Sequence, residues 1–271
     1  FGTGNWFHKM WSKAEAKENQ FIPIKLKWDV HPERNQEWRD SQDTLLGDPR
    51  LAAQECDCDF NTSGDTVITP EELTYMEKNT VVEPYEKRGY DKALWIWKPV
   101  DYSKNYLMIV DVARGDGKDF STAQVIELES NEQVAEYKGQ ISPKDLAYFA
   151  RGLAVEYNEA ILVVENNSYG WSTIQTLIEM GYNKLYYSPK NSSDLTDSYF
   201  NPYNDNTNMI PGFVTSMKTR PILIGKLQEY INERSLIIRS KRTLGELRTF
   251  IWKNGRPEAQ QGYNDDLVIP L

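Results

Sequence analysis

Four carboxylates of the sequence stand at the ends of apolar segments, where they could act together. Asp111 closes the run YLMIVD, and Glu165 directly follows ILVV. Asp265 and Asp266 open the segment DDLV. Clustered carboxylates repel one another unless cations bind among them, and Mg²⁺ or Mn²⁺ prefers oxygen ligands. Two such ions roughly 3.5–4 Å apart can activate a water and stabilise the leaving oxygen in phosphodiester cleavage. The four acids therefore predict a two-ion site.

Each of these acids also has a purely structural interpretation. Asp111 alone could end a strand and bond to the glycine-containing loop after it. Glu165 favours function, because a carboxylate directly after Ile-Leu-Val-Val is costly to desolvate without a partner. At least one of Asp265 and Asp266 is expected to cap a helix and complement its dipole. Asp119 is expected to be a loop acid near the site rather than a ligand.

The loop after Asp111 raises a competing interpretation. The segment RGDGKDFS contains Gly-Lys, and LMIVD resembles the strand of a nucleotide site. The sequence has no G-x-x-x-x-G-K-[ST] spacing, which excludes a Walker A loop from it. An actin-like or sugar-kinase site would need two further glycine-rich phosphate loops, which the sequence does not contain. A metal site is therefore favoured over a nucleotide site.

The composition excludes other kinds of chemistry. The two histidines, His8 and His31, lie far from the acidic motifs in sequence, so imidazole catalysis is not expected. Cys56 and Cys58 are too few for a disulfide framework, and they do not complete a zinc site without other ligands. A reducing, intracellular environment is therefore the default expectation. No apolar run approaches a membrane span, and no signal peptide is recognised. A start at Phe1 suggests a fragment of a longer protein.

The charge distribution allows DNA contact only through a local basic surface. The 271 residues carry a net charge of -9. Residues 218–261 hold ten Lys or Arg and four Glu, a net of 10 − 4 = +6. Basic side chains beside acidic metal ligands would hold backbone phosphates, although an ordinary solvated helix face has the same pattern. The candidate DNA-binding residues are Lys218, Arg220, Lys241, Arg242, Arg248, Lys253 and Arg256.

The pattern after residue 99 predicts an α/β arrangement. Three strands joined by short loops predict an antiparallel meander, followed by a helix with Ser142 as its N-cap. The apolar run AILVVEN predicts a central strand, and Glu165 would face the same crevice as Asp111 if their strands are neighbours. The polar stretch Ser188–Met217 predicts a long functional loop. Strands are expected at 105–112, 121–129, 132–140, 160–166, 184–188 and 235–240. Helices are expected at 142–158, 169–181, 219–233, 242–252 and 263–271, the last capped by Asn264. Asn254-Gly255 marks a hairpin at 252–261.

The first hundred residues predict a mixed α+β segment rich in tryptophan. Helices are expected at 5–14 and 70–79, and strands at 21–29 and 91–99, the second with one face buried. No convergent set of chemical groups is recognised there.

The three acidic motifs, in their order, resemble those of a known family. YLMIVDVARGDGKDFS, ILVVENNSYG and GYNDDLV are similar to motifs in the nuclease domain of the large terminase subunit of tailed bacteriophages. GFVTSMKTRPILIGKL and LRTFIW resemble intervening segments, and FGTGNWFHKMW resembles the stretch after the last motor motif of the ATPase domain. The resemblance implies a connector from the end of the ATPase motor domain at 1–99. It implies a ribonuclease-H-like nuclease domain, a mixed sheet flanked by helices, at 100–271.

The family resemblance also implies an activity and its partners. It implies a Mg²⁺- or Mn²⁺-dependent endonuclease that cuts concatemeric double-stranded DNA during packaging in the host cell cytoplasm. Asp111 would bridge two ions, with Glu165 and one of Asp265 and Asp266 as further ligands, and Asp119 stands where the family often has another acid. The implied partners are the portal protein, the small terminase subunit and the ATPase domain of the same chain, with no membrane. The Walker loops are absent, so no ATPase activity is expected of this segment.

Two other interpretations stay open on the sequence. The basic segment 218–261 would suit a non-catalytic DNA-gripping or docking module, which binds DNA in a salt-sensitive way without cutting it. A junction resolvase or transposase would share the ribonuclease-H-like core, although the connector-like first hundred residues argue against it by resemblance alone.

Overall fold

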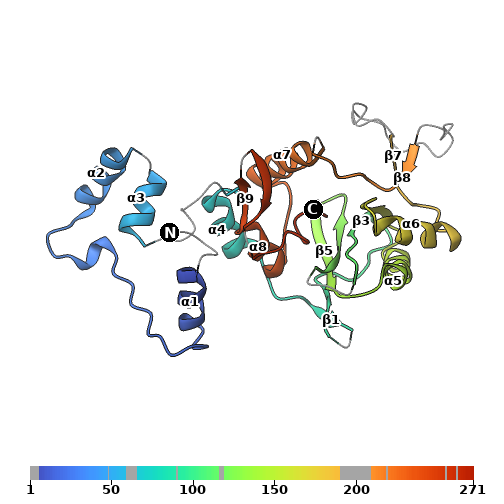
Figure 1. Cartoon of the computed structure of the whole chain (residues 1–271), viewed down its shortest axis with the longest axis horizontal. Coiled ribbons are helices and arrows are strands. Elements are labelled where there is room, and N and C mark those ends of the chain that lie inside the picture. Colours follow the sequence, from blue (N-terminus) through green and yellow to red (C-terminus); the bar gives the residue numbers. More distant parts are fainter. Residues whose placement is uncertain are drawn as a thin grey trace. The chain divides into compact units, whose positions relative to one another are not determined.

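The structure is a computed structural model that describes residues 6–47, 49–58, 66–89, 91–115, 119–189, 209–217, 219–253, 255–260 and 262–271. The chain forms two compact units, coloured along the sequence in Figure 1. Unit 1 comprises Phe1–Leu73 and Arg248–Tyr263, and unit 2 comprises Thr74–Leu247 and Asn264–Leu271.

Unit 1 consists of short helices and one β-hairpin. Helix α2 (Gln36–Leu46) begins where the Asn35 side chain accepts a hydrogen bond from the Trp38 N–H at 2.9 Å. It ends at Gly47, whose φ of 69° favours glycine. The other elements are α1 (Trp6–Glu15), the 3₁₀-helix η1 (Trp28–Val30), α3 (Pro49–Cys56), the start of α4 (Pro70–Asn79), and the antiparallel strands β9 (Phe250–Lys253) and β10 (Arg256–Ala259).

The structure corrects two expectations in unit 1. Residues 21–29 form no strand among the described residues, and Ile22 is 83% exposed, because alternation of apolar and polar residues supplies no partner for the backbone. The helix expected to reach residue 252 ends earlier, since β9 pairs with β10 instead. The predicted hairpin is confirmed, with Gly255 at a φ of 74°, while Asn254 lies outside the described residues.

Unit 2 is built on a six-stranded mixed sheet of order β1-β2-β5-β4-β3-β6. The expected antiparallel meander is confirmed in β3, β4 and β5. Strand β6 runs parallel to β3, and β1 and β2, which precede residue 100, extend the sheet beyond β5. The strands are β1 (Glu86–Arg88), β2 (Leu94–Ile96), β3 (Tyr106–Asp111), β4 (Ser121–Glu127), β5 (Glu132–Gly139) and β6 (Ile161–Val164).

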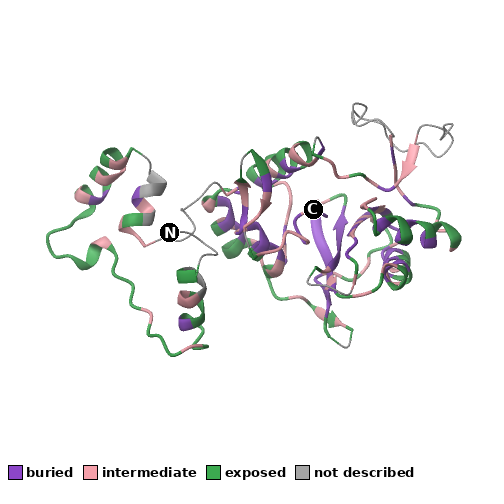
Figure 2. Cartoon of the chain, viewed as in Figure 1, coloured by how far each residue is buried: buried purple, intermediate pink, exposed green. Residues whose placement is uncertain are grey.

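Helices α5 (Pro143–Glu156) and α6 (Gly170–Glu179) supply much of the apolar core of unit 2. Ser142 caps α5 as expected, accepting a hydrogen bond from the Asp145 N–H at 3.2 Å. The core-facing sides of both helices are buried in Figure 2. Leu146, Leu153, Ile174 and Leu177 from these helices share the core with Met108 and Val110 of β3.

Strands β4 and β5 carry buried polar side chains as well as apolar ones. Gln124 and Glu136 are fully buried, so their polar atoms need partners inside the protein. Glu136 accepts from Arg242 Nε at 2.6 Å and from the Thr243 hydroxyl, both on α8 (Lys241–Leu247). Helix α8 therefore packs on this part of the sheet through a hydrogen-bonded network. Helix α7 (Thr219–Asn232) precedes it in the chain.

Strand β6 is not central, contrary to the expectation from its apolar sequence. It is the last strand in the sheet order, and single parallel bridges from Leu162 to Leu185 and from Glu165 to Phe213 follow its outer edge. The apolar composition follows from packing, since Leu162 and Val164 are fully buried in the core with residues of α5 and α6.

Other elements of unit 2 differ from the sequence-based expectation in their extent. Residues 93–97 are buried throughout, not on one face, because β2 lies between two strands. Residues 235–240 make only one bridge, at Ile237, and residues 266–270 form turns rather than a helix. The expected strand at 184–188 is reduced to a bridge at Leu185 and β7 (Tyr187–Pro189), which pairs with β8 (Met209–Pro211). Residues 190–208 of the expected loop lie outside the described residues.

Candidate active site

Asp111 and Glu165 lie side by side because their strands are parallel neighbours. Val110 of β3 pairs with Val164 of β6, and the Glu165 N–H donates to the Val110 carbonyl at 2.8 Å. Asp111 is the last residue of β3, so both carboxylates emerge at the same end of the sheet. Functional groups of open α/β sheets collect at this end.

The surroundings of Asp111 make its charged form unfavourable. Burial raises the pKa of Asp111 well above its ordinary value, and a hydrogen bond shared with Glu165 and the charges of Glu165, Asp266 and Asp265 raise it further. An apolar hollow of about 500 Å³ borders Asp111 and Glu165, which lowers the local polarity. Glu165, Asp265 and Asp266 therefore all act electrostatically on Asp111.

Asn167 and Gly170 position the end of β6, and no sequence pattern indicated either role. Asn167 donates from Nδ2 to Glu165 Oε2 at 3.1 Å, and its Oδ1 accepts from the Gly170 N–H at 2.7 Å. A Cβ at Gly170 would collide with the carbonyl oxygen of Glu165. Glycine at the start of α6 thus permits the close approach that positions the glutamate.

The segment that carries Asp265 and Asp266 forms hydrogen-bonded turns and is also held by buried side chains. The Asp266 carbonyl accepts from Thr122 Oγ1 at 2.6 Å, and the Leu267 carbonyl accepts from Gln124 Nε2 at 3.2 Å. The Leu267 N–H donates to Glu246 Oε2 at 2.7 Å. These partners satisfy the peptide groups around Asp266, so its position is fixed without a helix.

The Asp266 carboxylate faces β4 and β5 of the same unit. Its Oδ2 accepts from Asn264 Nδ2 at 2.8 Å and from the Phe120 N–H at 3.4 Å. Lys138 Nζ lies 4.0 Å from the same oxygen and also pairs with Glu246. Burial raises the pKa of Asp266, while Asn264 and Lys138 act in the opposite direction. The expected capping roles are wrong, because Asn264 binds Asp266 instead of starting a helix.

Asp265 has a different partner from its neighbour. Its Oδ2 accepts a hydrogen bond from the Arg220 guanidinium, and the two side chains form a half-buried ion pair. Arg220 lies in the first turn of α7. A residue proposed for DNA contact is thus bonded to a proposed metal ligand.

The donor set fits a hard divalent cation. The candidate groups are oxygen ligands, and the pKa of Asp111 is raised first by burial and then by the neighbouring carboxylates, whose repulsion a bound cation would relieve. Within the described ranges, no three His, Cys, Asp or Glu side chains are close enough to hold an ion.

The other site candidates are more dispersed. Asp119 is exposed in the loop next to Phe120. Lys241 pairs with Glu83 at 2.5 Å, and Lys253 pairs with Glu258 at 2.7 Å. Arg242 is bound to buried Glu136, which is a structural role that the sequence did not indicate. Arg256 is exposed and Arg248 half-buried, both in unit 1, whereas Lys218 lies outside the described residues.

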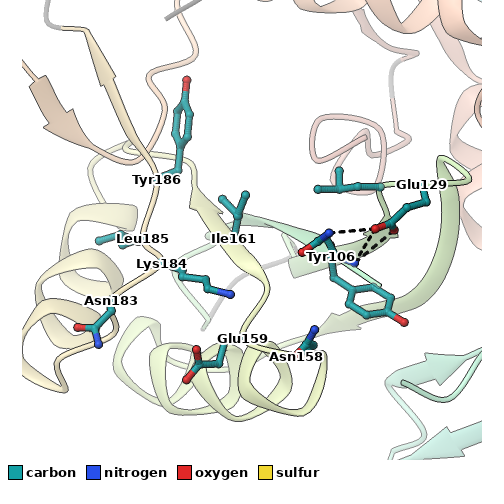
Figure 3. A pocket seen from close by; sticks show the side chains of 11 residues that line it. Tyr106, Glu129, Asn158, Glu159, Ile161, Asn183, Lys184, Leu185 and Tyr186 are labelled. Atoms are coloured by element: carbon teal, nitrogen blue, oxygen red, sulfur yellow. Dashed lines mark hydrogen bonds between the residues drawn. The ribbon is translucent and has the colours of Figure 1, made fainter. Parts of the chain in front are cut away.

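A second hollow lies near the opposite end of the same strands. Its volume is about 550 Å³, and Tyr106 and Ile161, the first residues of β3 and β6, line it (Figure 3). Glu129 on its rim accepts from the Asn105 N–H at 3.1 Å and from Asn105 Nδ2 at 3.0 Å. No helix within the described part of the chain is long and apolar enough to span a membrane.

The sheet order and the strand-end acids can be compared with solved structures. The chain is similar to the large terminase nuclease of thermophilic phage G20c with bound magnesium, with a TM-score of 0.56 and 17% identity, over 76% of this chain and 94% of that one. The same nuclease with bound cobalt gives a TM-score of 0.54 and 16% identity, over 73% and 93%. The large terminase nuclease domain of Thermus phage P74-26 gives 0.51 and 16%, over 73% and 90%.

The fold is that of a large terminase nuclease. The expected ribonuclease-H-like class, a mixed sheet flanked by helices, is confirmed, and so is the resemblance in fold to this family. No family model matches the chain. In this terminase-nuclease fold, the four acids lie at the shared end of β3 and β6 and in the segment bound to β4 and α8.

Proposed function

We propose that this chain is a metal-dependent endonuclease that cleaves double-stranded DNA. The observation that supports it is the position of Asp111 and Glu165 side by side at the shared end of β3 and β6, in a sheet with the terminase nuclease fold. The G20c nuclease of the same fold has been solved with magnesium and with cobalt, which are divalent cations. A site of carboxylates without histidine suits Mg²⁺ or Mn²⁺.

Each acid has a proposed role in holding the ions. Asp111 would be shared by two ions, since it lies among the other three acids, and Glu165 and the Asp265–Asp266 pair would complete the ligand set. Two bound ions supply charge stabilisation and water activation for phosphodiester hydrolysis. The chain itself fixes the ligands: the β3–β6 pairing sets the spacing of Asp111 and Glu165, and Thr122 and Gln124 fix the backbone around Asp266.

A plasmid-nicking assay tests this function. With Mg²⁺ or Mn²⁺, the wild-type chain is expected to nick supercoiled DNA, and Asp111→Asn to lose at least about a hundredfold in rate, because a shared ligand loses its charge. Glu229→Gln, an exposed substitution on α7, serves as the control and should cut normally. Full activity of Asp111→Asn would rule out this site. Salt-sensitive DNA binding without cutting by the wild type would favour the DNA-gripping module.

The wider biological role follows only from the family resemblance. We propose that the nuclease acts in packaging of viral DNA in the host cell cytoplasm, with the portal protein, the small terminase subunit and the ATPase domain of the same chain as partners. The N-terminal segment would be the connector to the motor domain. The sequence-based boundary at residue 100 would leave β1 and β2 in that connector, although β2 is hydrogen-bonded to β5 of the sheet.

A further inference from the structure

Arg220 is the basic side chain that directly bonds one of the four clustered acids. Its guanidinium pairs with Asp265 Oδ2, and the two side chains are 28% and 25% exposed. The pair is thus open enough for solvent, ions or DNA to reach it. Lys138 pairs with Glu246, and its Nζ lies 4.0 Å from Asp266 Oδ2.

The backbone of Arg220 is fixed independently of its ion pair. Ser216 Oγ accepts from the Thr219 N–H at 3.1 Å, and Thr219 Oγ1 accepts from the Ser216 N–H at 2.8 Å. The Arg220 N–H donates to the Ser216 carbonyl at 2.9 Å. This reciprocal cap fixes the start of α7. The long side chain can therefore leave Asp265 by rotating about its own bonds, without movement of the helix.

The two adjacent aspartates differ in how their positions are maintained. The peptide groups next to Asp266 bind Thr122 and Glu246, and its carboxylate accepts from a backbone N–H. The Asp265 carboxylate, in contrast, accepts a hydrogen bond from the long side chain of Arg220. A cation that binds Asp265 would compete with that guanidinium, whereas Asp266 is already positioned.

We propose that Arg220 is an exchangeable counterion of the metal site. It neutralises Asp265 while no divalent cation is bound, and it transfers to a DNA backbone phosphate when the cation takes Asp265. Arginine suits both positions, because its planar fork pairs with carboxylate and phosphate alike. Metal and DNA should consequently bind cooperatively, since each favours the released state of Arg220. The inference rests on the proposed function and adds a link between ion and substrate binding.

Calorimetric titration of the whole chain with Mn²⁺, without DNA, tests the competition. Arg220→Gln is expected to bind Mn²⁺ about fivefold more tightly than the wild type, the change that corresponds to losing one half-exposed ion pair. Arg220→Met, which keeps the apolar stem, should show the same gain. Lys226→Gln removes one positive charge from the same helix and should leave Mn²⁺ affinity unchanged. Unchanged or weaker Mn²⁺ binding by folded Arg220→Gln or Arg220→Met would overturn the proposal.

The same titration with a cleavage-resistant phosphorothioate duplex tests the transfer to phosphate. The duplex should tighten Mn²⁺ binding by the wild type, and this gain should shrink by about fivefold in Arg220→Gln. An equal gain in both proteins would contradict the transfer. The proposed nuclease activity can fail separately: a wild type that binds Mn²⁺ but does not nick plasmid would refute the activity and leave the exchange of Arg220 measurable.

Discussion

Adjacent residues in this chain have markedly different surroundings, as Asp265 and Asp266 show. Asp265 is bound to Arg220, whereas Asp266 belongs to a buried network that includes Lys138 and Glu246. Burial raises the pKa of Glu246 to about 7, although Lys138 and the Leu267 N–H oppose the shift. Glu246 therefore connects the fold's polar interior to the backbone next to Asp266.

Substitution of Glu246 tests this connection at the residue scale. Glu246→Ala should lower the free energy of unfolding by about 3 kcal/mol, because it leaves the Lys138 charge and the Leu267 N–H without their partner. Glu246→Gln keeps an acceptor for that N–H and should cost about 1 kcal/mol. Chemical denaturation measures both, with Glu229→Gln as an exposed control. Equal stability of Glu246→Ala and the wild type would show that the network contributes nothing.

At the scale of elements, the end of β6 is enclosed by backbone from two other segments. Gly170 begins α6 against the Glu165 carbonyl, and Gly212 follows β8 against the Val164 carbonyl with a φ of 79°. A side chain at either position would collide with the strand end. The position of Glu165 thus depends on close approach of three segments.

Gly170→Ala is predicted to displace the end of β6. The added methyl group should cost about 1–3 kcal/mol of stability, because the backbone must shift to accommodate it. Nicking should fall more than expected from unfolding alone, since Glu165 moves with the strand. Gly152→Ala on α5 is the matched control: its Cβ meets nothing within 4 Å, so a gain of up to about 1 kcal/mol is expected. Thermal unfolding and nicking rates measure both variants, and normal activity of Gly170→Ala would contradict the prediction.

At the scale of the whole molecule, acids outnumber bases, and three acids with raised pKa values lie near one another in unit 2. Asp111, Asp266 and Glu246 all hold protons more tightly in the folded chain than in the unfolded one. Their contribution to stability is therefore present at low pH and is lost as the pH rises through their folded-state pKa values. For Glu246 this loss extends from about 4.5 to about 7.

Metal removal should expose this pH dependence. In EDTA, the melting temperature is expected to fall as the pH rises from about 5 to about 8, because the folded state must release protons that it binds tightly. Mn²⁺ should reduce this fall, since a cation that binds only the folded state stabilises it more when the carboxylates are deprotonated. Scanning calorimetry with Asp111→Asn as the comparison measures the effect. The same pH profile with and without Mn²⁺ would argue against a cation site.

Local patterns were sufficient to predict many elements of the fold. Short loops between three strands predicted the meander, Ser142 predicted the start of α5, and Gly255 marked the hairpin. Patterns failed where the partner is distant in sequence. The apolar run of β6 suggested a central strand, but the two bridges at its outer edge can be known only from the folded chain.

The sequence by itself identified the four acids and placed Asp111 and Glu165 at the ends of apolar segments, because residue type and local pattern are read from the sequence directly. The folded sheet decided that β3 and β6 are parallel neighbours, so that the two carboxylates meet. Only the tertiary structure decided how the Asp265–Asp266 segment is held and what accompanies it. Thr122 and Glu246 form hydrogen bonds with the backbone of Asp266 and Leu267, and Arg220, 45 residues away, pairs with Asp265. The physical reason is that buried peptide groups and charges need partners, and packing between distant segments determines which side chains provide them.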